Sequence, residues 1–357
     1  MAGILTGEGV GPEVISAALQ VLQAIEQASG IAVQLRYGGP IGLAALRDSG
    51  TCLSPEVIDF CTNVFADGGC IFCGPGGGDF VYRLRERFDL YCKFTPIHEL
   101  AALHGVSRIK PAYLAGIDMI VVRENSAGLY LGDSGIENLP CGDRLATHQF
   151  RYKSSQVERI LDVARRLAQA RRGSLTVVTK PGGIPAISSL WLDALESMET
   201  EGLTVRRLEI DYAIYQLLSA PHEFDVIVAP NMFGDVLSDA AALLMGARGV
   251  SYSGNFGPAG RAVYQTGHGA AKDLAGTNQA NPLGQIQSLA MMLRESFGLQ
   301  EQAQWIHRAI DRVLRAGWRT LDIAEPDSRV VGTREMGEIV ADAVQAEADA
   351  GQLMYGS

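Results

Sequence analysis

The sequence predicts an α/β fold with a large, mostly parallel sheet, because short apolar runs alternate with helical patterns along the chain. The expected strands include residues 119–122, 174–179, 205–210 and 225–230. Each is followed at once by a polar or charged side chain: Arg123, Lys180, Asp211 and Asn231. Open α/β sheets place reactive groups just past the carboxyl ends of their strands, so these side chains are candidates for a functional site.

Three segments carry the clearest helical patterns. From Pro12 to Ala28 apolar residues recur at i, i+3 and i+4, and the proline suits the first turn. Residues 157–170 are expected to form a second amphipathic helix. Residues 285–297 form an apolar helix whose leucines and methionines are expected in the core.

Length and composition bound the class of protein. A chain of 357 residues can bury a large core and is long enough for two lobes. Its net charge of −10 argues against a nucleic-acid partner, which would require a basic face. No apolar stretch reaches the roughly 18 to 20 residues that span a bilayer, and the first residues do not resemble a signal peptide. We therefore expect a cytoplasmic enzyme without a membrane or nucleic-acid partner.

Cys70 and Cys73 form a CxxC motif, which is found in redox pairs and in half-sites for zinc. The surrounding GGCIFCGPGGG is typical of a buried strand that enters a glycine loop, and no second CxxC or histidine pair follows. We therefore predict structural thiols, which pack as small apolar side chains.

The segment GEGVGPEV at 7–14 differs from a Rossmann fingerprint, because its third glycine comes one residue too early. No acidic residue at a clear strand end follows about 20 residues later. Gly7 and Gly9 are instead expected to allow tight turns and close approach of the backbone.

Asp235 and Asp239 stand one helical turn apart in NMFGDVLSDAAALLMG, so their carboxylates share a helix face and repel. The neighbouring residues are largely apolar, which predicts a mostly buried helix whose carboxylates require a partner. Oxygen ligands favour a hard ion such as Mg²⁺ or Mn²⁺. The alternative is an exposed acidic helix start, since aspartate is favoured near a helix N-terminus.

Several further motifs occur along the chain: LRERFDLY at 84–91, VVRENSAGLYLG at 121–132, RYKSSQVERI at 151–160, VVTK at 177–180, EIDYA at 209–213 and HGAAKDLAG at 268–276. With the aspartate helix and GEGVGPEV, they make the chain resemble the β-decarboxylating dehydrogenases, the family of isopropylmalate, isocitrate, homoisocitrate and tartrate dehydrogenases. The resemblance implies a two-lobed fold with a large mixed sheet and a cofactor site that is not of the Rossmann type. One lobe would combine residues 1–97 and 247–357, and residues 98–246 would form an inserted lobe with the dimer interface.

The resemblance implies NAD-dependent oxidative decarboxylation of a 3-substituted malate with a divalent ion, Mg²⁺ or Mn²⁺, which lowers the pKa of the substrate hydroxyl. The implied ion ligands are Asp235 and Asp239, with Asp211 supplied by the other subunit of a homodimer. Lys180 is the implied base, with its pKa lowered by the ion and by partial desolvation. Tyr152 is the implied acid that protonates the enolate carbon. The active sites would be shared, because Lys180 and Asp211 would reach across the dimer interface.

Arg85 and Arg123 match two arginines that bind substrate carboxylates in the family. A third position carries Thr95, and Lys93 lies two residues earlier on the same face of an extended segment. Lys93 is therefore either a substitute anion ligand or a surface lysine that extends its amino group into solvent. The segment that selects the 3-substituent offers Asp79, Val81, Tyr82 and Arg83.

The cofactor prediction rests on the motif HGAAKDLAG and on the ANP that follows it. Asp273 matches an aspartate that accepts hydrogen bonds from the adenosine ribose, and Leu274 follows where members preferring NADP carry other residues. NAD is therefore the implied cofactor, although Lys272 leaves its strictness open. His268, Gly269 and Asn281 complete the implied contacts.

Several departures from the family pattern bear on the substrate. Pro181 and Gly182 follow the lysine, Gln265 and Thr266 replace a Glu-Pro pair, and Glu8 stands where aspartate is usual. We expect a specialised pathway and a polar or anionic substituent, such as a carboxylate or phosphonate. The alternatives are an isopropylmalate, isocitrate or homoisocitrate dehydrogenase of primary metabolism, a tartrate-like dehydrogenase, and a non-catalytic regulatory subunit.

Overall fold

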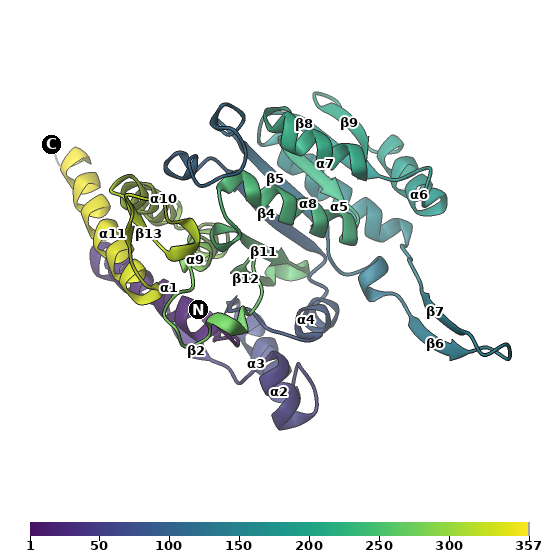
Figure 1. The fold of residues 1–357 in the computed structure, drawn as a ribbon, viewed down its shortest axis with the longest axis horizontal. Helices are drawn as coiled ribbons and strands as arrows, with labels where there is room; N and C mark the ends of the chain where they lie inside the picture. The colour runs from purple at the N-terminus through teal and green to yellow at the C-terminus, as the bar shows by residue number, and fades with distance from the viewer. Residues whose placement is uncertain (356–357) are drawn as a thin grey trace.

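In the computed structural model, which describes residues 1–355, one mixed sheet of ten strands runs through the molecule (Figure 1). Its strand order is β2-β1-β3-β12-β11-β4-β5-β10-β8-β9. The strands are β1 (Ala2–Leu5), β2 (Leu35–Tyr37), β3 (Cys70–Cys73), β4 (Cys92–His98), β5 (Asp118–Glu124), β8 (Ser174–Thr179), β9 (Thr204–Glu209), β10 (Val226–Ala229), β11 (Tyr252–Phe256) and β12 (Ala262–Thr266). The four predicted runs coincide with β5, β8, β9 and β10, which confirms an α/β fold on a large sheet.

The sheet consists of two parallel groups joined by an antiparallel centre. β2, β1, β3 and β12 pair in parallel at one end, and β5, β10, β8 and β9 do so at the other. Between them β11 and β4 run antiparallel to their neighbours. The carboxyl end of β5 therefore lies beside the start of β4, although the two ends are far apart along the chain.

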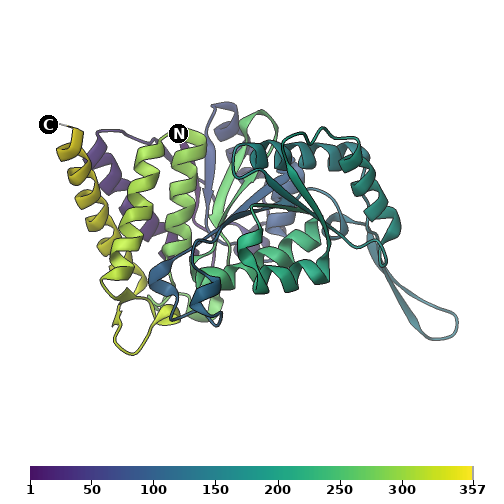
Figure 2. The ribbon, with the colours of Figure 1, turned by 90° about the horizontal axis from the view of Figure 1, so that it is seen from above.

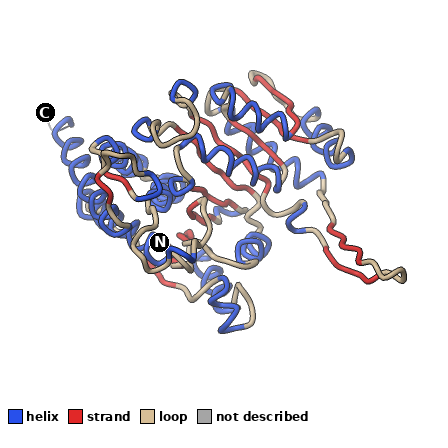
Figure 3. The backbone as a smooth tube through the Cα atoms, viewed as in Figure 1, coloured by secondary structure: helices blue, strands red, loops and turns tan. Residues whose placement is uncertain are grey.

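Helices pack against the sheet and extend its ends (Figures 1 and 3). They are α1 (Gly11–Ser29), α2 (Gly42–Ser49), α3 (Pro55–Ala66), α4 (Phe80–Phe88), α5 (Ser154–Gln169), α6 (Pro185–Glu196), α7 (Ile210–Ser219), α8 (Asn231–Ala242), α9 (Leu283–Phe297), α10 (Gln300–Arg315) and α11 (Thr333–Tyr355). The three helices predicted from periodicity are α1, α5 and α9. α1 has proline in its first turn and ends at Gly30 in the left-handed conformation, as its sequence favours. None of the described helices combines the length and apolar character needed to cross a bilayer.

The core runs along both faces of the sheet. α9 is buried over Leu283–Leu293, because it lies between the sheet and the helices α1 and α10. Figure 2 shows α9, α10 and α11 side by side at this end of the molecule. Cys70 and Cys73 are free and buried in β3, and burial raises the pKa of Cys70 to about 11. The CxxC pair is thus a structural element of a strand, as predicted.

A two-stranded arm, β6 (Ser134–Asn138) and β7 (Arg144–His148), projects from the body (Figures 1 and 2). Every residue of the two strands is exposed in the single chain. Hydrophobic periodicity in the sequence did not predict this arm, because no face of the arm is buried against this chain. A second short pair, β13 (Trp318–Arg319) and β14 (Arg329–Val330), lies near the C-terminal helices.

Candidate active site

A cleft of about 260 Å³ opens beside the start of β4 and the end of β5. Its walls come from α4, β4, β5, α8 and the segment that follows β12. Residues predicted from the sequence line it: Val81, Tyr82, Arg85, Lys93, Arg123, Asp235, His268 and Gly269. Arg248, Gln265 and Thr266 line it as well, although the sequence had not assigned them to the site. The structure therefore brings together substrate, metal and cofactor candidates that lie far apart along the chain.

Lys93 and Arg123 stand directly opposite each other on the antiparallel strands β4 and β5. Both are buried, with 9% and 1% of their surfaces exposed. Like charges placed across a strand pair repel. Burial, together with Arg123 and Arg85, lowers the pKa of Lys93 to about 7. The alternative of a surface lysine is therefore excluded, and Lys93 belongs to the cleft.

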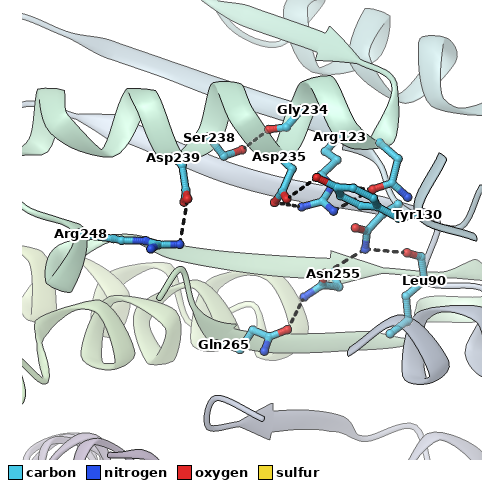
Figure 4. Close-up of polar contacts among 12 residues, drawn as sticks. Leu90, Arg123, Tyr130, Gly234, Asp235, Ser238, Asp239, Arg248, Asn255 and Gln265 are labelled. Atoms are coloured by element: carbon cyan, nitrogen blue, oxygen red, sulfur yellow. Dashed lines mark hydrogen bonds and ion pairs between the residues drawn. The ribbon is translucent and has the colours of Figure 1, made fainter. Parts of the chain in front are cut away.

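Arg123 is held in place by α8. Its Nε and Nη2 donate to Asn231 Oδ1 over 2.9 and 2.7 Å, and its Nη1 pairs with Asp235. The helix can approach because Gly234 has no side chain: a Cβ there would lie 2.8 Å from Arg123 Cβ. Figure 4 shows Arg123 beneath the helix with Asp235 turned toward it.

Asp235 and Asp239 differ from the sequence prediction in their burial. Their side chains are 41% and 53% exposed, so the expectation of a mostly buried carboxylate pair is wrong. Each has an arginine partner: Asp235 binds Arg123, and Asp239 accepts from Arg248 Nη2 over 2.8 Å (Figure 4). Burial by itself would raise the pKa of Asp235, but Arg123 and Lys93 hold it below its ordinary value. These arginines offset the repulsion between the two carboxylates.

The divalent-ion site can be assessed from the donors present. Within the residues that the structure describes, no three metal-ligating side chains gather in one place. Asp235 lines the cleft, and Asp239 pairs with Arg248, which also lines it. Two carboxylates one turn apart at the edge of a cleft suit a hard ion that takes a third ligand from elsewhere. The residues present therefore fit the predicted ion, with Asp211 required from another chain.

Lys180 and Asp211 lie away from the cleft of their own chain. Lys180 Nζ donates to Asp211 Oδ1 over 2.7 Å and to Glu209 Oε2 over 2.6 Å. In the single chain the pKa of Lys180 is raised, because its amino group is solvated and doubly paired. The predicted lowering requires the bound ion and partial desolvation, so it stays a prediction. The sequence pattern did not single out Glu209, the last residue of β9, because the family motif points to Asp211 two residues later.

Tyr152, the predicted acid, is engaged within the fold. Its Oη accepts the Asn231 N–H over 2.8 Å, and its ring packs edge-on against Trp191. Burial and the neighbouring Glu124 raise its pKa well above the ordinary value. The lining of the cleft in the single chain does not include Tyr152, so its role as the acid stays a prediction.

Tyr130 is the tyrosine that contacts Asp235, one of the predicted ion ligands. Its Oη donates to Asp235 Oδ2 over 3.1 Å, and its ring lies 5.6 Å from the Arg123 guanidinium (Figure 4). Tyr82, which lines the cleft, packs edge-on against it. Burial and Asp235 raise the pKa of Tyr130 to about 12. Its signal was present in the motif VVRENSAGLYLG, but sequence distance hid its contact with Asp235.

The specificity segment is only partly in the cleft. Val81 and Tyr82 line it, whereas Arg83 is exposed and pairs with Asp79 over 2.5 Å along the surface of α4. The structure thus places Arg83 outside the lining. Arg85 is buried at the cleft, and its Nε has no hydrogen-bond partner in the described chain. Burial lowers its pKa, as does Arg123.

The glycine loop near the N-terminus contacts the predicted cofactor segment. Gly7 and Gly9 have φ values of 82° and 62°, which favour glycine. Val10 N donates to Ala270 O over 2.9 Å, and a Cβ on Gly9 would lie 1.9 Å from the same oxygen. The expected close backbone approach is confirmed.

The remaining cofactor candidates divide into free and engaged groups. Asp273 is exposed at the surface of this loop, whereas Leu274 packs against Val10 and Val14. His268 Nδ1 lies 2.9 Å from Gly269 O, and burial lowers the pKa of the imidazole. Asn281 is occupied within the fold: its Nδ2 donates to Asp322 Oδ2 and its Oδ1 accepts the Leu283 N–H. The carboxylate predicted to bind the ribose is thus exposed to solvent, whereas Asn281 is hydrogen-bonded within the fold.

Comparisons with known proteins agree with this geometry. The family model for isocitrate/isopropylmalate dehydrogenase matches residues 2–340. The chain is 36% identical to the 3-isopropylmalate dehydrogenase of Bacillus licheniformis, over 95% of this chain and 94% of that protein. It is 35% identical to the same enzyme of Geobacillus kaustophilus, over 98% and 97%. The crystal structure of isocitrate dehydrogenase from Methylococcus capsulatus superposes with a TM-score of 0.85 at 30% identity, covering 96% of this chain and 99% of that one.

The match extends over nearly the whole chain and includes the helix that carries Asp235 and the loop that carries His268. It accounts for the ten-stranded mixed sheet and for the meeting of these segments at one cleft. This chain belongs to the isocitrate/isopropylmalate dehydrogenase family.

Proposed function

We propose that the protein catalyses the NAD-dependent oxidative decarboxylation of a 3-substituted malate. The observation that carries the proposal is the cleft in which Arg85 and Arg123 stand beside Asp235. Arginines bind substrate carboxylates through paired hydrogen bonds, and a carboxylate at the same place holds an activating cation. Such a site suits an anionic hydroxy acid that must lose a proton from its hydroxyl.

The relatives favour 3-isopropylmalate as the substrate over the specialised one expected from the sequence. The relatives from Bacillus licheniformis and Geobacillus kaustophilus are both named 3-isopropylmalate dehydrogenases. Val81 in the cleft wall is compatible with an apolar substituent. A polar or anionic substituent is the second candidate, and the observation that favours it is the buried Lys93.

The ion would be held by Asp235 and Asp239 with Asp211 of the partner subunit, and NAD by the His268–Leu274 segment. When bound, the ion polarises the hydroxyl and NAD accepts the hydride. The acid that protonates the substrate carbon would be Tyr152, as the family motif implies, or Tyr130, whose hydroxyl contacts Asp235. Lys180 of the partner subunit would take the hydroxyl proton.

A homodimer with shared sites is supported by what the single chain leaves exposed. Four large apolar side chains are exposed on α7, on α8 and directly after α8: Tyr212, Tyr215, Val236 and Leu243. The two tyrosines stack in parallel there, 6.2 Å apart. The exposed arm also carries Ile136 and Leu145. Exposed apolar groups in such numbers mark an interface between subunits.

The division into two lobes, residues 1–97 with 247–357 and residues 98–246, remains a proposal. It is supported by the sheet, since strands from both ends of the chain form one half and β5, β8, β9 and β10 form the other. The cleft lies where the halves meet.

The proposal is tested by measuring NADH and CO₂ together with Mn²⁺ and a panel of malates: malate, 3-isopropylmalate, isocitrate, homoisocitrate and tartrate. Equal amounts of NADH and CO₂ from a 3-substituted malate are expected, with NADP replacing NAD poorly. A 2-oxo product without CO₂ would instead indicate a tartrate-like dehydrogenase. Lack of turnover across the panel, in an enzyme that is folded and dimeric, would indicate a regulatory subunit.

A further inference from the structure

We infer that Lys93 is a specificity-determining residue whose amino group binds an anionic terminus on the 3-substituent of the substrate. The inference rests on the proposed function and takes up the second of its two candidate substrates: a 3-substituted malate whose substituent ends in an oxygen-rich anion, a carboxylate or a phosphonate. It adds a contact to those made by Arg85 and Arg123 with the two carboxylates of the malate core.

The first argument is that Lys93 is buried and makes no direct ion pair. Only 9% of the residue is exposed, and none of the ion pairs of residues 1–355 includes it, although the charges of Asp235 and Asp239 favour its protonated form. Its opposite neighbours on the sheet are Arg123 on β5 and Asn255 on β11, neither of which is anionic. Burying an unpaired ammonium group costs free energy, and the cost is recovered when an anion arrives. A ligand anion is the partner that this position lacks.

The second argument is that the neighbour of Lys93 on β11, Asn255, belongs to a chain of neutral amides. Asn125 Nδ2 donates to Asn255 Oδ1 over 3.0 Å, and Asn255 Nδ2 donates to Gln265 Oε1 over 3.3 Å (Figure 4). Gln265 continues into the lining of the cleft. A carboxylate anywhere along this chain of hydrogen bonds would neutralise the lysine. The amides supply hydrogen bonds without supplying charge, so Lys93 stays available to a ligand.

The third argument comes from the charges that line the cleft. The cations are Arg85, Lys93, Arg123 and Arg248, and the acid is Asp235. Arg248 is paired with Asp239, and Arg85 and Arg123 are the arginines proposed to bind the two malate carboxylates. Lys93 is the further cation of the lining, and none of the ion pairs of residues 1–355 includes it.

Lys93 is also not a simple replacement for an arginine at position 95. Thr95 points to the same side of β4 but stands opposite Val121, two residue pairs further along. Two residues along a strand correspond to about 7 Å, so the amino group reaches a different part of the cleft. An anion bound at Lys93 is thus separate from one bound near position 95.

The test is steady-state kinetics of the full-length enzyme with NAD and Mn²⁺ on 3-isopropylmalate, isocitrate and 3-(phosphonomethyl)malate. The wild-type enzyme is expected to prefer one of the two anionic substituents, and which of them wins distinguishes a carboxylate from a phosphonate. Lys93→Met should lower kcat/KM for that substrate about 10- to 100-fold, mostly through KM, since it removes one charge-assisted hydrogen bond. The value for 3-isopropylmalate should stay within about threefold of wild type, because no charged contact is lost.

A second variant guards against misfolding of the first. Gln265→Glu keeps Lys93 and places a carboxylate in its neighbourhood, so it should produce the same selective loss. Lys110→Met, an exposed lysine outside the cleft, serves as the matched control and should change nothing. An equal loss on all substrates would show that Lys93 binds the malate core, and an unchanged preference would show that it binds neither. Either result overturns the inference while turnover of 3-isopropylmalate leaves the proposed function standing.

Discussion

The hydroxyl of Tyr130 donates a hydrogen bond to Asp235 Oδ2 over 3.1 Å, while Oδ1 of the same carboxylate pairs with Arg123. One aspartate thus joins a candidate acid to the substrate-binding arginine. The contact spans more than a hundred residues of sequence and forms because α8 lies across the end of β5. It makes Tyr130 a second candidate, beside Tyr152, for the acid that acts on a ligand held at Asp235.

If Tyr130 is the acid, its replacement should abolish the proton-transfer step. Tyr130→Phe is expected to lower kcat about 100- to 10,000-fold with little change in KM, because a positioned acid contributes on that scale. The measurement is NADH formation on the best substrate of the panel. Tyr152→Phe is the matched control: it should keep kcat within a few-fold and lose about 1 kcal/mol of unfolding free energy with its hydrogen bond to Asn231 N. The reverse pattern would identify Tyr152 as the acid.

Subunit complementation tests whether the sites are shared. Lys180→Ala and Asp235→Asn should each be inactive alone. After the two are unfolded and refolded together, about a quarter of wild-type activity should return, since half of the dimers are mixed and one of their two sites is intact. If the lysine and the aspartate acted in the same chain, no mixed dimer would hold an intact site. Activity that stays absent in a confirmed mixed dimer would count against sharing.

Arg248 pairs with Asp239, so it is expected to compete with the proposed divalent ion for this carboxylate. The pair is 2.8 Å apart, and both side chains are more than half exposed. Arg248→Met should tighten Mn²⁺ binding about two- to fivefold, which is the range of exposed ion pairs, whereas Asp239→Asn should weaken it. Titration of Mn²⁺ followed by electron paramagnetic resonance reports binding without turnover. Equal Mn²⁺ affinity in wild type and Asp239→Asn would remove this carboxylate from the ion site.

Lys93 should make the stability of the ligand-free enzyme depend on pH. Its folded pKa is about 7, and its ordinary value is 10.5, so between these values the unfolded chain binds more protons than the folded one. This residue's contribution to the free energy of unfolding therefore rises as pH increases from 7 to 10. Lys93→Met should be more stable than wild type at pH 7, and the difference should shrink by pH 10. Urea unfolding at both pH values gives the comparison, and a difference that is constant with pH would contradict the buried charge.

Much of the architecture follows from local pattern. Runs such as SLTVVT become strands where expected, and α1 starts at its proline and stops at Gly30, because periodicity and backbone preference act within a few residues. Gly7 and Gly9 predicted a close approach of the backbone for the same reason. The order of the motifs likewise predicted the family and most of the side chains that line the cleft.

What the sequence alone determined, then, is the set of elements and the identity of the reactive side chains. The tertiary structure decided which of them meet. Strand register placed Lys93 opposite Arg123. Helix packing brought Tyr130 and Arg248 to the two aspartates that are predicted to bind the ion. Lys180 stayed solvated beside Asp211. These relations depend on long-range packing and burial, which set pairing distances and pKa values and which have no counterpart in local sequence.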